Sequence, residues 1–384
     1  MGGSSALLSG LIEDGAIALE DSPFLHSAPA PLPVEGLRDR AEGMLLGLCV
    51  GNALALPTEG VLPEDRRARF GEVDDHAASA YGPAGSMSVD AQLSLRTAKR
   101  LLTDGRLDPA ALARDLAAPG HIVLGDTLAR FVERYNSGMG WERSGAPSAG
   151  NGALMRIAPV VLAHLAHPED PSPDLWADAA IAGMITHNDG AANSACVAFV
   201  KLIWDCLAGD VPSSAAWIER YVAVAAPLEP ADEFESSGTY ANEFFGTQRP
   251  FSGTLSAFVK QEIPALEKER TVFDACAGWG SGAYLLETVP SALYILARHG
   301  DSFEEAVRRA VNDTWDNDTI ACIVGAVMGA AHGRSSIPEG WLDVLNPGGE
   351  TGALLRESLS LLPRLAGSFE IEDVSGERKK DRHT

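Results

Sequence analysis

The stretch "VNDTWDNDTIACIVGAVMGAAHG", from Val311 to Gly333, joins an acidic segment directly to a run of small and apolar residues. Asp316, Asp318 and Thr319 immediately precede the run, which places them at the N-terminus of a predicted helix, where carboxylates cap N–H groups and are stabilised by the helix dipole. Capping needs only one such residue, and two carboxylates that converge with a hydroxyl repel each other unless a cation lies between them. The stretch is compatible with a polar cap or with a site for a hard divalent cation, because all-oxygen ligands favour Mg²⁺, Mn²⁺ or Ca²⁺ over Zn²⁺.

The apolar run also predicts close helix packing. Gly325 and Gly329, together with Ala326 and Ala330, form a face of small residues that lets a second helix approach. Apolar residues recur at helical spacing in many other segments, whereas alternating strand patterns are scarce. The sequence therefore predicts an all-α fold built as a single large helical domain.

We expect this domain to span residues 36–366. The preceding residues 1–35 are rich in Gly, Ser and Ala and end in the proline-rich "HSAPAPLPVEG", so we expect a poorly ordered arm with one short helix near residues 7–19. Residues 367–384 have the composition of a solvated C-terminal tail.

Composition excludes several classes of protein. The 384 residues carry a net charge of −23, which argues against a general nucleic-acid binder. The five cysteines form no CxxC pair, which favours buried free thiols in a reducing compartment over a zinc site. With no secretory signal and no uncharged apolar run of about 18 residues, we expect a cytoplasmic protein without a membrane span. The oligomeric state stays open.

Two further segments could supply ligands to a cation. Ser88 and Asp90 immediately precede the amphipathic pattern "AQLSLRTAKRLL", and Glu59 ends the glycine-punctuated pattern "GLCVGNALALPTE". Taken alone, Ser88 and Asp90 are equally typical of an ordinary helix start.

Taken together, these segments resemble the ADP-ribosylglycohydrolase family. The motifs that carry the resemblance follow the family's order and are "GLCVGNALALPTEG", "SVDAQ", "GNGALMRIAPV", "THND" and "TWDNDTI". The resemblance covers residues 38–345 and implies the family's all-helical fold.

The resemblance also implies a metal site that holds Mg²⁺, or Mn²⁺ in some members, against the distal ribose of ADP-ribose. The implied metal ligands are Ser88, Asp90, Asp316, Asp318 and Thr319. Glu59, Asp90 and Asp316 are the implied catalytic residues. Paired metals can hold a diol and polarise water, so the implied chemistry is consistent with these ligands.

ADP-ribose itself is expected to contact two glycine-rich segments and a histidine. The implied substrate-binding residues are Gly150, Asn151, Gly152, Ala153, His187, Gly280, Ser281, Gly282 and Tyr284. Glycines in such loops permit close backbone approach to phosphates, whereas Met155 and Arg156 are expected to secure the loop.

The chain departs from the family pattern at several positions. Val89 and Asn52 replace two aspartates, Ala91 replaces a threonine, Thr314–Trp315 replaces two glycines and Asn317 replaces a threonine. Fewer carboxylates weaken the charge balance for two dications, so one or two ions remain possible. We expect a metal-dependent hydrolase that removes ADP-ribose from an acceptor; the alternatives are a catalytically weakened binder of ADP-ribose or another nucleotide, which acts as a sensor, and a structural role. The sequence does not identify the acceptor.

Overall fold

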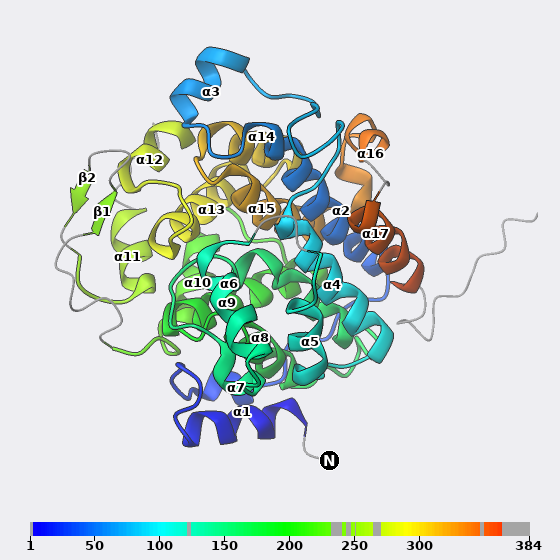
Figure 1. The fold of residues 1–384 in the computed structure, drawn as a ribbon, viewed down its shortest axis with the longest axis vertical. Coiled ribbons are helices and arrows are strands. Elements are labelled where there is room, and N and C mark those ends of the chain that lie inside the picture. Colours follow the sequence, from blue (N-terminus) through cyan, green and yellow to red (C-terminus); the bar gives the residue numbers. More distant parts are fainter. Residues whose placement is uncertain are drawn as a thin grey trace, which may run out of the picture.

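A computed structural model of the chain describes residues 3–120, 124–231, 240–242, 247–249, 251–263, 270–345 and 349–362. Helices dominate this part of the chain, which confirms the predicted all-α class (Figure 1). The α-helices are α1 (Ser4–Glu13), α2 (Leu37–Ala55), α3 (Pro63–Phe70), α4 (Val89–Asp104), α5 (Pro109–Leu116), α6 (Asp126–Asn136), α7 (Trp141–Ser144), α8 (Asp174–Met184), α9 (Gly190–Leu207), α10 (Ala216–Ala225), α11 (Leu255–Glu262), α12 (Val272–Trp279), α13 (Leu285–His299), α14 (Phe303–Asp313), α15 (Asn317–His332), α16 (Glu339–Val344) and α17 (Gly349–Leu361). Short 3-10 helices are η1 (Pro23–His26), η2 (Leu56–Thr58), η3 (Leu154–Arg156), η4 (Ala158–His164) and η5 (Arg334–Ser336), and the antiparallel strands are β1 (Tyr240–Asn242) and β2 (Thr247–Arg249).

Helices α2 and α15 pack backbone to backbone in the core (Figure 1). A Cβ on Gly43 or Gly47 would overlap the backbone of Gly329 or Gly325 on the facing helix. Gly51 meets the backbone of α15 in the same way one turn further along. The predicted small-residue face of α15 is therefore confirmed, and its partner is a row of glycines spaced four apart on α2. The contact fixes the distance between the end of α2 and the start of α15, where the candidate site lies.

Two long apolar helices lie inside this core. The segments Leu37–Thr58 and Gly190–Leu207 are long and apolar enough to cross a membrane, yet 89% and 94% of their most apolar windows are buried within the protein. This burial is typical of core helices.

The N-terminal segment differs from our expectation of a poorly ordered arm. Helix α1 packs on α8, and Leu8 and Leu11 are buried there with exposed fractions of 3% and 7%. The indole Nε1 atoms of Trp176 and Trp204 donate to the carbonyl oxygens of Ser27 and Ala30 at 2.8 and 2.7 Å. Leucines and these indole hydrogen bonds therefore dock a segment whose average composition indicated disorder. The predicted C-terminal tail, residues 367–384, lies outside the described residues.

Candidate active site

The N-termini of α4 and α15 meet, and this meeting builds the acidic site. Ser88 caps α4, and its Oγ donates to Asp318 Oδ2 at 2.9 Å. In return, Thr319 Oγ1 on α15 donates to Asp90 Oδ2 on α4 at 2.6 Å. The structure thus brings together two acidic segments that are more than 200 residues apart, as the metal-ligand prediction requires.

Asn52, near the end of α2, joins the same site. Its Oδ1 accepts a hydrogen bond from Ser88 N at 2.8 Å, and its Nδ2 donates to Ser88 Oγ at 2.7 Å. The same Nδ2 lies 3.5 Å from Asp318 Oδ2. A neutral amide therefore occupies a position where the family pattern has a carboxylate.

Burial and mutual repulsion raise the pKa values of the site carboxyls. Burial raises the pKa of Asp90 well above its ordinary value, and the charges of Asp318 and Asp316 raise it further. Burial and then Asp318 raise the pKa of Asp316 to about 7. Burial also raises the pKa of Asp318, although the Ser88 hydrogen bond opposes this change. The three carboxyls therefore disfavour simultaneous ionisation unless positive charge is supplied.

Glu59 follows η2 at the solvent-exposed side of the acidic site. Partial desolvation, followed by repulsion from the Asp318 carboxylate, raises the pKa of Glu59 to about 7, although the residue as a whole is exposed. Near neutral pH, this carboxyl group can therefore either accept or donate a proton.

The donor set fits a hard cation in its chemistry, because it comprises the buried carboxylates of Asp90 and Asp318, the half-buried carboxylate of Asp316 and two hydroxyls. The carboxylates accept hydrogen bonds from Thr319, Asn151 and Ser88. Within the described ranges, no group of three or more His, Cys, Asp or Glu side chains is arranged as a metal-binding group. These hydrogen bonds place the predicted metal ligands close together, whereas the metal centre itself stays a prediction.

The glycine-rich loop at residues 150–152 supports the acidic site through a contact with Asp316. Asn151 Nδ2 donates to Asp316 Oδ2 at 2.6 Å and to Thr288 Oγ1 at 2.9 Å. Its backbone N donates to Ala283 O at 2.9 Å, and Asp316 N donates to Ser281 O at 2.8 Å. The two loops predicted to bind ADP-ribose, at residues 150–152 and 280–284, are thus linked directly to each other and to Asp316. The Asn151 amide orients Asp316.

His187 lies against the same loop. Arg156 Nη2 donates to Thr186 Oγ1 at 2.6 Å, and Thr186 Oγ1 lies 2.9 Å from His187 Nδ1. We assign the hydroxyl proton to the bond with Nδ1, which leaves the ring proton on Nε2. Burial and then the Arg156 charge lower the pKa of His187 to about 3, so the ring is neutral. A Cβ on Gly152 would lie 2.9 Å from Nε2, so a glycine is required where the ring packs on the loop.

Three further residues were predicted to bind ADP-ribose: Ala153, Gly280 and Tyr284. Ala153 has no exposed surface and packs in the hydrophobic core, so only its backbone is placed beside the loop at residues 150–152. Gly280 ends α12 with a φ of +85°, a conformation that favours glycine. Tyr284 is half-buried and precedes α13.

Trp315 contacts both the turn after Glu59 and the loop at residues 280–284. Its backbone N donates to Ser281 Oγ at 2.9 Å, and its indole Nε1 lies 3.4 Å from Gly60 O. A Cβ on Gly282 would lie 2.9 Å from the indole ring. The indole therefore lies between the turn after Glu59 and the loop at residues 280–284, next to Asp316 in sequence.

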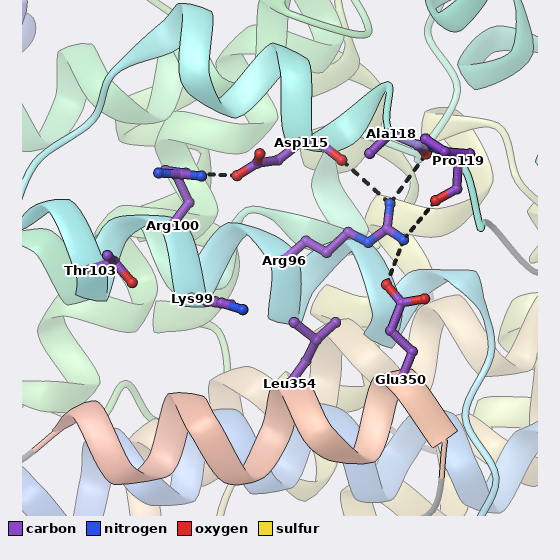
Figure 2. A pocket seen from close by; sticks show the side chains of 9 residues that line it. All are labelled: Arg96, Lys99, Arg100, Thr103, Asp115, Ala118, Pro119, Glu350 and Leu354. Carbon is purple, nitrogen blue, oxygen red and sulfur yellow. Dashed lines mark hydrogen bonds and ion pairs between the residues drawn. The ribbon is translucent and has the colours of Figure 1, made fainter.

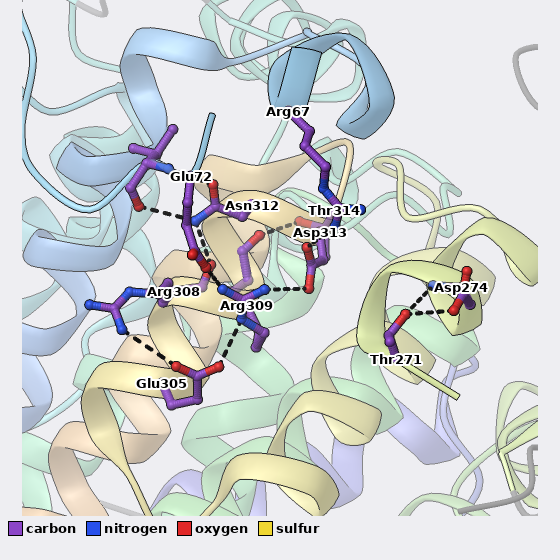
Figure 3. Close-up of polar contacts among 12 residues, drawn as sticks. Arg67, Glu72, Thr271, Asp274, Glu305, Arg308, Arg309, Asn312, Asp313 and Thr314 are labelled. Carbon is purple, nitrogen blue, oxygen red and sulfur yellow. Dashed lines mark hydrogen bonds and ion pairs between the residues drawn. The ribbon is translucent and has the colours of Figure 1, made fainter. Parts of the chain in front are cut away.

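Asp313 does not belong to the acidic site, although it lies close in sequence. Its Oδ2 pairs with Arg309 Nη1 at 3.2 Å, and its Oδ1 pairs with Arg67 Nη2 at 3.4 Å (Figure 3). Arg309 also pairs with Glu72 and Glu305. These ion pairs hold the end of α14 and the segment around α3 together behind the site.

Arg66, which the sequence analysis did not single out, connects the two halves of the site. Its Nε and Nη2 donate to Thr58 Oγ1, Thr58 O and Val61 O at 3.0, 3.3 and 2.9 Å. Its Nη1 donates to Asn312 O and Thr314 O at 3.1 and 2.7 Å. All five guanidinium N–H groups are thus used in joining the turn that carries Glu59 to the segment that leads into Asp316.

A separate cavity of about 460 Å³ lies between α4, α5 and α17 (Figure 2). Its charged side chains form ion pairs: Arg96 with Glu350 at 2.6 Å and Arg100 with Asp115 at 2.6 Å. Lys99 pairs with Glu357 at 2.9 Å. These pairs join α17 and the end of α5 to α4, and none of the predicted site residues lines this cavity.

Comparison with known proteins defines the class to which this fold and site belong. The model of the ADP-ribosylglycohydrolase family matches residues 33–372, so the chain belongs to this family. An ADP-ribosyl-[dinitrogen reductase] glycohydrolase from Rhodospirillum rubrum is 26% identical over 86% of this chain and 98% of its own length. The ADP-ribosylarginine hydrolase Tri1 from Pseudomonas putida is 25% identical over 83% of this chain and 78% of its own. Among solved structures, an ADP-ribosylglycohydrolase-related protein complex matches with a TM-score of 0.63 and 28% identity, covering 86% of this chain and 99% of that chain.

Proposed function

We propose that this chain is a metal-dependent hydrolase that removes ADP-ribose from a modified acceptor or from an ADP-ribosyl metabolite. The observation that carries the proposal is the reciprocal pair of hydrogen bonds, Ser88 to Asp318 and Thr319 to Asp90, that unites the two acidic motifs. Relatives whose names state ADP-ribosyl hydrolysis support the reaction class.

Ser88, Asp90, Asp316, Asp318 and Thr319 would hold the cation, which we propose to be Mg²⁺ or Mn²⁺. When bound, such a cation supplies a fixed positive charge and Lewis acidity toward the hydroxyls of a ribose. The three aspartates carry a charge of −3 when ionised, so one dication leaves −1 and a second would leave +1. The two occupancies leave residual charges of equal size, so the neutral Asn52 amide, which withholds a fourth carboxylate beside Asp318, is what disfavours a second ion.

Glu59 would act first as the general base and then as the general acid. A water oxygen attacks the anomeric carbon of the ribose, and the bond between that carbon and the acceptor breaks. Glu59 takes a proton from the water and returns one to the departing acceptor, a role that suits a carboxyl group with a pKa of about 7. Asn151 would keep Asp316 in position during this step.

The remaining loop residues would bind the rest of ADP-ribose. The neutral, buried ring of His187 would support the part of the loop at residues 150–152 on which it packs. Gly150 and Gly152 permit close approach of the backbone to that ligand.

A second candidate is a protein that binds ADP-ribose without efficient turnover. Asn52 favours this reading, because its amide donates to Ser88 and lies 3.5 Å from Asp318 where the family pattern has a carboxylate. A neutral group at this position reduces the attraction for a second cation.

Calorimetric titration of ADP-ribose with Mg²⁺, and again with EDTA, tests both candidates, because ADP-ribose is the shared ligand whatever the acceptor. Release of ADP-ribose from ADP-ribosylarginine then separates them. We expect Mg²⁺-dependent binding and turnover that Asp316→Ala abolishes, with Asp313→Asn as the control outside the acidic site. Activity that survives Asp316→Ala overturns the metal assignment. Binding without turnover of any ADP-ribosylated substrate supports the second candidate, and no binding in either buffer overturns both.

A further inference from the structure

The N-terminal segment, residues 3–32, lies outside the part of the chain that matches the family, yet it reaches the turn that carries His187. Ala18 N donates to Asn188 Oδ1 at 2.9 Å, and Asn188 Nδ2 donates to Ala16 O at 2.8 Å. The Asn188 amide is therefore bonded to the N-terminal backbone from both of its ends. Asn193 adds a hydrogen bond from its Nδ2 to Ala18 O at 3.0 Å.

The opposite side of the same turn is held by a different segment. Ala146 N donates to Thr186 O at 3.0 Å, and Asn188 N donates to Ala146 O at 2.9 Å. His187 thus lies between two residues whose backbones pair with Ala146. The N-terminal segment supplies the second support, through the Asn188 side chain.

The N-terminal segment is anchored well away from this turn. Ser5 N and Ser5 Oγ donate to Asp174 Oδ1 at 2.7 and 2.6 Å, at the first residue of α8. Asn188 follows the other end of α8, a helix of 11 residues that spans about 16 Å. Ile17 and Leu19, with exposed fractions of 4% and 6%, keep the segment docked beside Asn188. The contact with Asn188 can therefore be removed without detaching the segment.

We propose that the N-terminal segment is a positioning element of the ADP-ribose site, which holds the turn at residues 186–188 through Asn188 so that the buried His187 ring stays packed on the loop at residues 150–152. Asn188 is a positioning residue, because it acts through His187. This inference depends on the proposed function for its ligand. It predicts that losing the Asn188 contacts weakens ligand binding by loosening the turn, while the fold is retained.

The test compares Asn188→Ala with Asp174→Ala in the full chain. Each removes hydrogen bonds between the N-terminal segment and the body, but only Asn188 adjoins His187. We expect Asn188→Ala to weaken ADP-ribose binding about tenfold and to speed amide hydrogen exchange at residues 185–190. Asp174→Ala should change the affinity less than about twofold and speed exchange only around α1. Wild-type affinity in Asn188→Ala, or equal losses in the two variants, overturns the proposal.

Hydrogen exchange without ligand separates this inference from the proposed function. If the wild-type chain binds no ADP-ribose, the proposed function fails, and exchange alone decides whether the N-terminal segment positions the turn. Faster exchange at residues 185–190 in Asn188→Ala but not in Asp174→Ala then supports the positioning role. Unchanged exchange in Asn188→Ala overturns it.

Discussion

Asn52 and Ser88 bind each other reciprocally: Asn52 Oδ1 accepts from the Ser88 backbone N at 2.8 Å, and Asn52 Nδ2 donates to Ser88 Oγ at 2.7 Å. Ser88 Oγ then donates to Asp318 Oδ2 at 2.9 Å. The orientation of Asp318 therefore depends on an amide from α2, and Asn52 bonds the N-cap of α4 without adding a negative charge.

Replacing Asn52 by aspartate should make the acidic site dependent on a cation. Asn52→Asp removes the donor to Ser88 and places a fourth carboxylate beside Asp318. We expect the metal-free variant to be destabilised by about 1–3 kcal/mol, measured by urea unfolding in EDTA. Mg²⁺ should restore more stability to the variant than it adds to the wild-type chain. An equal effect of Mg²⁺ on both proteins would contradict this prediction.

Arg66 and Arg67 are adjacent and provide a matched comparison. Arg66→Met leaves buried carbonyl groups without donors, so we expect a loss of about 3 kcal/mol or more in the free energy of unfolding. Arg67 exposes 59% of its side chain while it pairs with Asp313, so Arg67→Met should cost less than about 1 kcal/mol. Chemical denaturation measures both, and similar losses for the two variants would show that the Arg66 hydrogen bonds add no special stability.

Close packing of α2 on α15 can be tested with two glycine substitutions. A Cβ on Gly47 would overlap the backbone of Gly325, whereas Gly10, inside α1, has nothing within 4 Å of such a Cβ. We expect Gly47→Ala to cost about 3 kcal/mol or more by overpacking. Gly10→Ala should stabilise the protein by about 0.5–1 kcal/mol through helix propensity. Thermal and urea unfolding of both variants provide the measurement, and a neutral Gly47→Ala would refute the backbone contact.

The pH dependence of stability follows from the raised pKa values of the acidic site. Between about pH 4 and pH 7, the folded chain binds more protons at Asp90, Asp316 and Asp318 than the unfolded chain does, so this contribution to stability falls as pH rises. Asp316, with a pKa of about 7, loses its contribution to stability as pH rises through about 7. In EDTA, Asp316→Asn should lose less stability between pH 5 and pH 8 than the wild type, by on the order of 1–3 kcal/mol.

A divalent cation should reverse this loss of stability at higher pH. Mg²⁺ should therefore raise the melting temperature of the wild-type chain more at pH 8 than at pH 5, where protons already neutralise the carboxyls. Equal pH slopes for wild type and Asp316→Asn in EDTA would show that these carboxyls do not control the dependence.

Helix patterns and capping residues made much of the fold and site predictable. Ser88 and the group from Asp316 to Thr319 stand where helices begin, so local sequence located both halves of the acidic site. Arg66 could not be distinguished in the same way. In "PEDRRARF" its neighbours look equivalent, yet Arg66 has no exposed surface, whereas the side chains of Arg67 and Arg69 are 59% and 63% exposed.

Average composition misled us at the N-terminus. Proline and small residues near the N-terminus predicted disorder, but a few well-spaced leucines decide how that segment packs, and an average hides them. Asp313 is close in sequence to Asp316, yet the end of α14 turns it toward Arg309 and away from the acidic site.

The glycine row between α2 and α15 restricts how this protein can change. Since the two backbones touch, no substitution of a side chain at that contact can adjust the spacing between Asn52 and Asp318 without forcing the helices apart. A change of acceptor specificity must therefore leave the packing of α2 on α15 intact and vary the surrounding loops. The turn after Glu59, the indole of Trp315 and the loop at residues 280–284 are the places where redesign can begin.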